Sequence, residues 1–175
     1  AGLASRATER GVRGALQVVQ SALHNGDRAG IVVLGGPTRW LGADIGRRQF
    51  YRVLDAVLAA GAGFETAAGS LAPRAAVPPG AIVVAFSTLL DTDFALALID
   101  LCKRGHVVIA VDTLEGAPFA TPQDPLIERM WGLQRSFMYR DMRTVGVDVV
   151  AWRDGAMLDQ VMALAPERRR SGRRR

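Results

Sequence analysis

Four short apolar runs, rich in Val, Ile and Ala, recur along the chain and are separated by longer segments of mixed polarity. The runs are residues 30–34, 81–86, 106–111 and 147–150. An unbroken run of this kind is typical of a strand that is covered on both faces, whereas strict alternation indicates a strand with one face in water. The pattern therefore predicts a buried and mostly parallel sheet.

Between these runs, apolar residues recur with the spacing of three and four that is typical of amphipathic helices. The predicted helices cover residues 4–24, 46–60, 93–104, 124–143 and 156–164. Residues 38–41 are predicted to pair back on 30–34 as an antiparallel edge strand, because a Gly-Gly-Pro turn joins the two. Residues 64–79, rich in Ala, Gly and Pro and without a clear period, are predicted to form a surface connection.

Helices and strands alternate along the chain, which predicts an α/β fold with a Rossmann-like, doubly wound, mostly parallel sheet and helices on both faces. We assign residues 1–166 to one such domain, because 175 residues with 49% hydrophobic content suffice for one core. A layered fold of this type normally opens with a strand, yet the first predicted element is a helix. We therefore expect a strand to be missing ahead of this helix.

The net charge of +5 is confined to the end of the chain. Residues 167–175 contain six Arg and one Glu, so basic and acidic residues balance in the rest of the sequence. A Gly-containing run of like charges cannot build a core, and we expect a disordered tail. Such a tail can contact an anionic membrane surface, although a solvated chain end is the simpler interpretation. We expect no specific nucleic-acid partner.

Cysteine content and hydropathy indicate the cellular compartment of the protein. The single cysteine, Cys102, excludes an internal disulfide and argues against Cys-rich zinc sites, as suits a reducing compartment. No apolar run approaches the ~20 residues that cross a bilayer, and the N-terminal residues lack the apolar core of a signal peptide. These features predict a cytoplasmic chain.

Candidate binding residues follow the clearest apolar run. Ser87, Thr88 and Asp91 come directly after residues 81–86, and ligands of parallel sheets bind beyond the carboxyl ends of the strands. Capping of the next helix is the simpler role for Asp91. Asp112 ends one predicted strand and Asp148 begins another, so we expect them at opposite edges of the sheet, where they cannot share an ion.

A second candidate site lies at the start of the helix predicted from residue 46. Arg47 and Arg48 lie there, where guanidinium groups and free backbone N–H groups attract an anion or an acidic partner surface. Solvation of both side chains is the simpler interpretation. His24, His106 and Cys102 lie apart in the predicted fold, without an acid, base or nucleophile partner. We therefore expect no enzyme activity.

The order of several sequence blocks resembles a known family. The blocks GDRAGIVVLGG, RWL, GRRQFYRVLDAVLA, PPGAIVVAFSTLLD and ALALIDLCKRGHVVIAVD follow one another as in the C-terminal part of the domain of unknown function 58 family. This family is a branch of von Willebrand factor A-like proteins often encoded beside MoxR-type AAA ATPases. The resemblance implies a protein-binding role with such an ATPase, at the cytoplasmic face of a membrane to which the parent protein is anchored. It also implies that the sheet lacks its first central strand, between residues 30–34 and 81–86. Either these two strands pair directly, or a partner lends a strand, or the sequence is incomplete, which we favour.

The resemblance also implies a divalent cation site whose residues are altered here. In von Willebrand factor A domains an Asp-x-Ser-x-Ser strand, a Thr from a second loop and an Asp after the fourth strand hold the cation through hard oxygen donors. The resemblance puts Thr88, beside Ser87, in place of the last Asp, and the second loop offers only Asp44. It therefore implies a degenerate site near Asp44, Ser87 and Thr88, and we expect no metal and no cofactor.

Two functional hypotheses follow from the sequence. The first is a non-catalytic, von Willebrand factor A-like protein-interaction module, favoured by the block order and by the lack of a catalytic set. The second is a nucleotide- or phosphate-handling enzyme, which only the analogy with Rossmann-like sheets favours.

Overall fold

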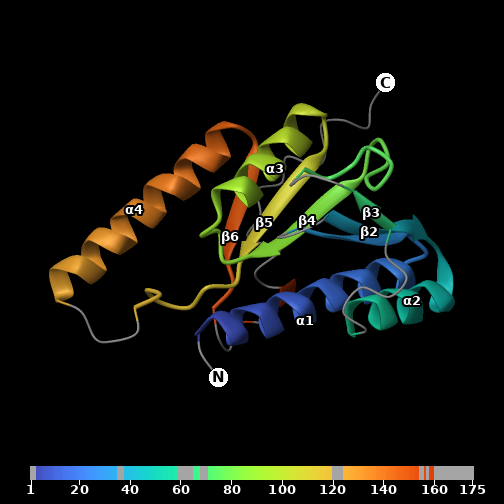
Figure 1. Ribbon diagram of the computed structural model, residues 1–175, viewed down its shortest axis with the longest axis horizontal. Coiled ribbons are helices and arrows are strands. Elements are labelled where there is room, and N and C mark those ends of the chain that lie inside the picture. Colours follow the sequence, from blue (N-terminus) through green and yellow to red (C-terminus); the bar gives the residue numbers. More distant parts are fainter. Residues whose placement is uncertain are drawn as a thin grey trace.

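Helices and strands alternate in the structure as the sequence predicts (Figure 1). The computed structural model describes residues 3–34, 38–58, 65–67, 71–119, 124–153, 156 and 158–159. In chain order the elements are α1 (Leu3–His24), β1 (Ala29–Val33), β2 (Thr38–Asp44), α2 (Gly46–Leu58), β3 (Glu65–Ala67), β4 (Ile82–Ser87), α3 (Thr92–Lys103), β5 (Val107–Asp112), α4 (Pro125–Thr144) and β6 (Val147–Ala151).

The described strands form two sheets of three strands each. In the first sheet, β1 and β3 both pair antiparallel with β2, and Val32 lies opposite Trp40. In the second sheet, β4 and β6 both pair parallel with β5, and Ser87 is level with Asp112. The protein is therefore an α/β protein with a parallel sheet flanked by helices, and this arrangement is compatible with a Rossmann-like fold.

Helices cover both faces of the parallel sheet. On one face, α3 and α4 contribute Leu98, Leu101 and Met142 to a core that also contains the β5 residues Val108 and Ala110. The opposite face of the sheet carries a second core, to which α1 contributes Val18. The other members come from the three strands and from the residue after β6, and they are Val84, Phe86, Ile109, Val111, Val150 and Trp152. A third core joins α1 and α2 to the antiparallel sheet and contains Val19, Leu41 and Val53 (Figure 1).

A glycine lets α1 approach the parallel sheet closely. A Cβ atom on Gly14 would lie 2.4 Å from a ring carbon of Phe86 and 2.7 Å from one of Trp152. Gly in a helix interior costs about 1 kcal/mol relative to Ala. The two rings, packed edge to face with centroids 6.1 Å apart, occupy the space that this residue leaves open. The close contact fixes α1 against the carboxyl-terminal half of β4.

The prediction of a surface connection over residues 64–79 is wrong. β3 pairs with β2 within this segment. Ala72, Ala76 and Val77 are buried in the same core as Trp40. Small apolar residues show no helix or strand period, so the sequence pattern gave no sign that this segment is buried. In the structure these small side chains belong to the same core as Trp40.

The two sheets stay separate in the described residues, at the place where the family resemblance implies a missing strand. β1 and β4 correspond to the predicted strands 30–34 and 81–86, and no backbone hydrogen bond joins them. The alternative in which these two strands pair directly is therefore wrong. Among the strands that the structure describes, each lies at the edge of its own sheet.

Two further predictions concern the end of the chain. The helix predicted over residues 156–164 lies mostly outside the described residues, and the tail 167–175 lies wholly outside them. None of the described helices combines the length and the apolarity needed to cross a membrane.

Candidate functional site

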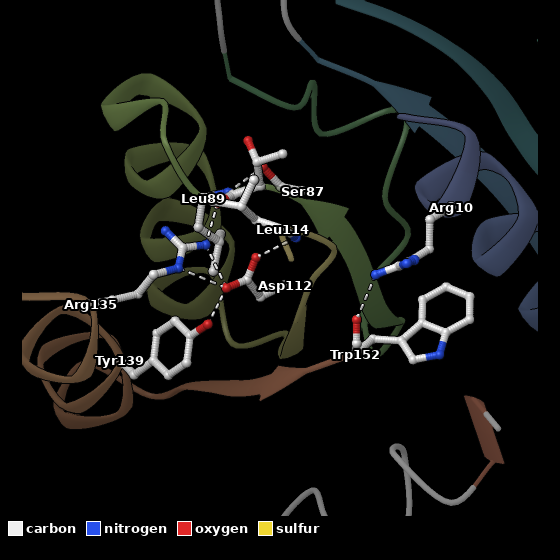
Figure 2. Close-up of polar contacts among 9 residues, drawn as sticks. Arg10, Ser87, Leu89, Asp112, Leu114, Arg135, Tyr139 and Trp152 are labelled. Carbon is white, nitrogen blue, oxygen red and sulfur yellow. Dashed lines mark hydrogen bonds and ion pairs between the residues drawn. The ribbon is translucent and has the colours of Figure 1, made fainter. Parts of the chain in front are cut away.

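The carboxyl ends of the three parallel strands meet at one edge of the sheet, as the fold class predicts. Asp112 is level with Ser87 of β4 and with Ala151 of β6. The chain continues the ladder one residue further, because Thr113 N–H donates to the Ser87 carbonyl and Trp152 N–H to the Asp112 carbonyl, both at 2.9 Å. This edge carries the main cluster of polar side chains shown in Figure 2.

Asp112 is the centre of that cluster. Its side chain is only 2% exposed. Oδ1 accepts a hydrogen bond from the Leu114 N–H at 2.9 Å. Oδ2 accepts from Arg135 Nε at 3.0 Å, from Arg135 Nη2, and from the Tyr139 hydroxyl (Figure 2). Both oxygens of the carboxylate are therefore used inside the protein.

Arg135 neutralises this buried carboxylate. Its side chain is 12% exposed. Nη2 also donates to the Thr88 carbonyl, so that one guanidinium joins the ends of β4 and β5. The guanidinium carbon lies 5.7 Å from the ring centroids of both Trp131 and Tyr139, within the range of a cation–π contact. The charge pair is thus enclosed by aromatic rings and backbone carbonyls.

Tyr139 acts in this cluster as a hydrogen-bond donor. Burial, and then the hydrogen bond to the Asp112 carboxylate, raise the pKa of Tyr139 well above its ordinary value. The hydroxyl therefore keeps its proton at neutral pH and supplies it to Asp112. A neutral phenol that donates to a paired carboxylate offers neither a base nor a nucleophile.

The cluster anchors the C-terminal half of α4. Arg143 reinforces it, because its Nη2 donates to the Val149 carbonyl of β6 at 2.7 Å. Met138 and Met142 pack into the core below the helix. The N-terminal half of α4 contacts the segment after β5 through Trp131, which packs edge to face against Phe119 with ring centroids 6.0 Å apart. In Figure 1 this half projects away from the body of the molecule.

A second polar contact closes the same edge from the side of α1. Arg10 Nη1 donates to the Trp152 carbonyl at 3.2 Å, and Arg10 Nη2 lies 2.6 Å from Glu115 Oε1 (Figure 2). The N-terminal half of α1 therefore lies at the carboxyl edge of the parallel sheet.

The residues predicted after β4 are present at this edge with local roles. The Ser87 Oγ accepts from the Leu89 N–H at 3.0 Å, and Leu89 has a positive φ of 52°. Asp91 is the N-cap of α3 and accepts from the Asp93 N–H at 2.9 Å, as the capping interpretation predicts. Thr88 contributes its carbonyl to Arg135. Ser87, Thr88 and Asp91 thus shape the turn between β4 and α3.

The second candidate site lies on a different part of the molecule. Arg47 and Arg48 are exposed in the first turn of α2 and have no ion pair with a described residue. Whether they bind an anion or an acidic partner stays a prediction. Asp44 ends β2. Its Oδ1 accepts from the Ile45 N–H at 2.8 Å, and its Oδ2 lies 3.6 Å from Arg52 Nη1. These contacts are those of a helix start on the protein surface.

Asp112 and Asp148 lie apart in the sheet, as the sequence predicts. Asp148 is level with Ile109, three residues before Asp112, so the two carboxylates lie toward opposite edges of the sheet. Burial, and then the charge of Asp148, raise the pKa of the Cys102 thiol. A thiol with a raised pKa is a poor nucleophile at neutral pH.

Sequence reasoning missed Arg135 and Tyr139. They are four residues apart on a predicted helix, so they share a face, and this face also carries Trp131. An Arg within an otherwise aromatic row on the inner face of a helix signals a buried acidic partner. Asp112, the only carboxylate that ends a predicted buried strand, was the candidate for that partner.

The described residues contain no group of three or more His, Cys, Asp or Glu side chains that could hold a metal ion. The absence of a metal and of a cofactor stays a prediction. Comparison of the chain with protein-family models, curated proteins and solved structures finds no match. The resemblance to the domain of unknown function 58 family therefore also stays a prediction.

Proposed function

We propose that this chain is a non-catalytic protein-interaction module of the von Willebrand factor A-like type, and that α4 carries its binding surface. The observation that carries the proposal is a row of large apolar side chains exposed along α4. The row consists of Leu126 (63% exposed), Met130 (61%), Leu133 (52%) and Phe137 (52%). We call these four residues the α4 row.

The spacing of the α4 row supports helical recognition. Its members follow one another at intervals of four, three and four residues, which places them on one side of the helix. An amphipathic helix with such a side binds either an apolar groove or another helix. The structure leaves this side of the helix exposed to solvent.

The energetics favour a partner of this kind. Burying a Leu, Met or Phe side chain stabilises a complex by roughly 1.5 to 3 kcal/mol. A soluble domain rarely exposes a contiguous apolar row without a use for it. The Asp112 cluster holds the C-terminal half of α4 rigidly, so the projecting half is presented without a large loss of conformational entropy on binding.

The polar edge of the sheet supports a binding role over a catalytic one. Asp112 is buried, paired with Arg135 and accepts from Tyr139 and Leu114, so its carboxylate is engaged within the protein and is not presented to a substrate. The partner that the family resemblance implies is a MoxR-type AAA ATPase. We propose that the α4 row docks on such an ATPase.

Binding to the MoxR-type ATPase encoded in the same genome tests the proposal. The double variant Leu133→Glu with Phe137→Glu removes two members of the α4 row. Its control, Gln134→Glu with Ser136→Glu, adds the same charge at exposed neighbouring positions outside the row. All four positions are exposed, so folding should be preserved in both.

We expect the row variant to weaken binding by at least ~100-fold, because each of two buried anchors is worth about tenfold or more. The control should bind within about threefold of wild type. Equal weakening by both variants would show that charge, not the row, governs binding. No binding of the wild-type chain would remove the ATPase as partner, and a melting temperature raised by ATP would favour the enzyme hypothesis instead.

A further inference from the structure

One border of the α4 row carries positive charge. Arg129 and Arg140 are both exposed, and about three helical turns separate them, so they lie on the same side of α4. The side chain of Arg140 is 71% exposed, and its guanidinium carbon lies 5.0 Å from the ring centroid of Phe137, a member of the row. We call Arg129 and Arg140 the basic border. It runs directly beside the apolar row.

The other border of the row carries less charge. Ile127, Gln134 and Asp141 lie there and are all exposed. Of these three only Asp141 is charged, and its Oδ1 lies 4.0 Å from Arg140 Nε. Both side chains are largely in solvent, and an ion pair this exposed is weak. Arg140 is therefore available to a carboxylate of a partner.

The narrowness of the row favours a helix as its partner. Its intervals of four, three and four residues are those of the a and d positions of a coiled coil, a seam narrower than the apolar side that packs into a core. Gly132 and Ser136 are exposed between the two Arg residues, and a Cβ atom on Gly132 would meet no other atom within 4 Å. A second helix can therefore lie along the row and reach the basic border.

A second copy of the chain does not supply the complementary charge. In an antiparallel pair of identical helices, each border lies beside the same border of the other copy. The two basic borders would then lie on the same side of the pair, and like charges oppose association. A partner with carboxylates beside its apolar seam avoids this repulsion and pairs with both Arg residues.

We propose, as a refinement that rests on the proposed function, that the α4 row binds an amphipathic helix whose apolar seam is bordered by carboxylates. Two of these carboxylates, about three turns apart, face Arg129 and Arg140. Charges along the border of a helix pair select the partner and its orientation. On a MoxR-type ATPase, the docking site is then an acidic surface helix.

Two designed peptides test this inference with the full chain. Both are helices of about three heptads with Leu at the a and d positions; one carries Glu at e and g, and its control carries Lys there. Binding of each labelled peptide is measured by fluorescence anisotropy at low and high salt. The variant Arg129→Gln with Arg140→Gln removes the basic border. Its control, Arg6→Gln with Arg13→Gln, removes the same charge from exposed positions of α1.

We expect the wild-type chain to bind the Glu peptide about tenfold more tightly than the Lys peptide at low salt, because attraction at the border replaces repulsion. This preference should fall to about twofold or less in the border variant and at about 1 M salt. The α1 control should keep it near tenfold. Equal binding of both peptides to wild type, or an equal loss of preference in both variants, would overturn the inference.

The peptides also separate this inference from the proposed function. A preference for the Glu peptide without any binding of the ATPase would support the acidic helix and remove the ATPase as partner. ATPase binding that the α4 row variant weakens, but that the border variant leaves unchanged, would support the row and overturn the acidic border. If neither peptide binds, the inference fails. A dimer that the row variant abolishes in sedimentation would then identify a second copy of the chain as the occupant.

Discussion

β4 and β5 have almost the same sequence character but very different burial. β4 reads IVVAFS and β5 reads VVIAVD, and both are nearly continuous runs of apolar residues. In β5 every residue after the first is buried, whereas in β4 every residue after the first is only partly buried. The difference lies in their neighbours, because β5 is paired on both sides and β4 on one. An apolar run therefore predicts that a strand needs a neighbour on each side to be fully buried. The structure shows whether the described residues provide both neighbours.

The carboxyl ends of the two strands differ in the same sense. β5 ends in Asp112, which is buried and satisfied by a guanidinium, a phenol and a backbone N–H. β4 ends in Ser87, which is partly buried and makes a local contact to Leu89. The well-covered strand thus carries the polar cluster that anchors α4. The poorly covered strand leads into a turn.

The largest effect is expected for Asp112→Asn. The variant leaves the Arg135 guanidinium buried without its counter-charge, which costs about 3 to 5 kcal/mol of unfolding free energy. Ser87→Ala, at the level position on β4, should cost about 1 kcal/mol or less. Urea denaturation followed by circular dichroism measures both. If both variants lost a similar amount of unfolding free energy, the ends of β4 and β5 would not differ in their contribution to stability, contrary to this account.

Truncation of one Val in each strand gives the next largest contrast. Val111 is fully buried in β5, and we expect Val111→Ala to cost about 2 to 3 kcal/mol through lost contacts and a cavity. Val84 of β4 belongs to the same core as Val111 but is only partly buried, so we expect Val84→Ala to cost about 1 kcal/mol of unfolding free energy. A Val84→Ala cost equal to that of Val111→Ala would contradict the comparison.

A smaller effect is expected for Tyr139→Phe, which removes one hydrogen bond to a charged group and costs roughly 1.5 kcal/mol at neutral pH. Its pH dependence is diagnostic. Because folding raises the pKa of Tyr139, the folded state holds this proton more tightly than the unfolded chain. The resulting stability is complete below the unfolded pKa of about 10 and is lost as the pH rises above it.

Wild type should therefore lose stability above about pH 10 more steeply than Tyr139→Phe. Tyr51→Phe is the matched control, because Tyr51 is 51% exposed on α2. Denaturation midpoints between neutral and alkaline pH measure the difference. Parallel curves for wild type and Tyr139→Phe would contradict the buried role of this hydroxyl.

Much of the fold follows from the sequence, because unbroken apolar runs and helical spacing are strong local signals. They predict β1, β4, β5, β6 and four of the helices within a few residues of their observed bounds. β3 and the buried Ala72 and Ala76 were not predicted, since small residues carry no periodic signal. They share a core with Trp40, Leu98 and Val108, which lie far from them in the sequence.

The candidate site was predictable only in part. The carboxyl edge, the cap formed by Asp91 and the separation of Asp112 from Asp148 follow from strand order. The pairing of Asp112 with Arg135 does not, because it depends on how α4 crosses the end of the sheet. The exposure of the α4 row also depends on how α4 crosses the end of the sheet, which the sequence does not show. Periodicity shows that one side of a helix is apolar and leaves open whether that side meets the core or the solvent.

Amide hydrogen exchange in β4 and β5 tests the central claim most directly, because it reports each backbone N–H separately. If β4 lacks a neighbour on the side away from β5, every second amide of β4 points to that side without a partner and should exchange about 100-fold or more faster than the amides of β5. The amides of β4 that donate to β5 should remain protected. Protection that is uniform along β4 and equal to that of β5 would contradict the account.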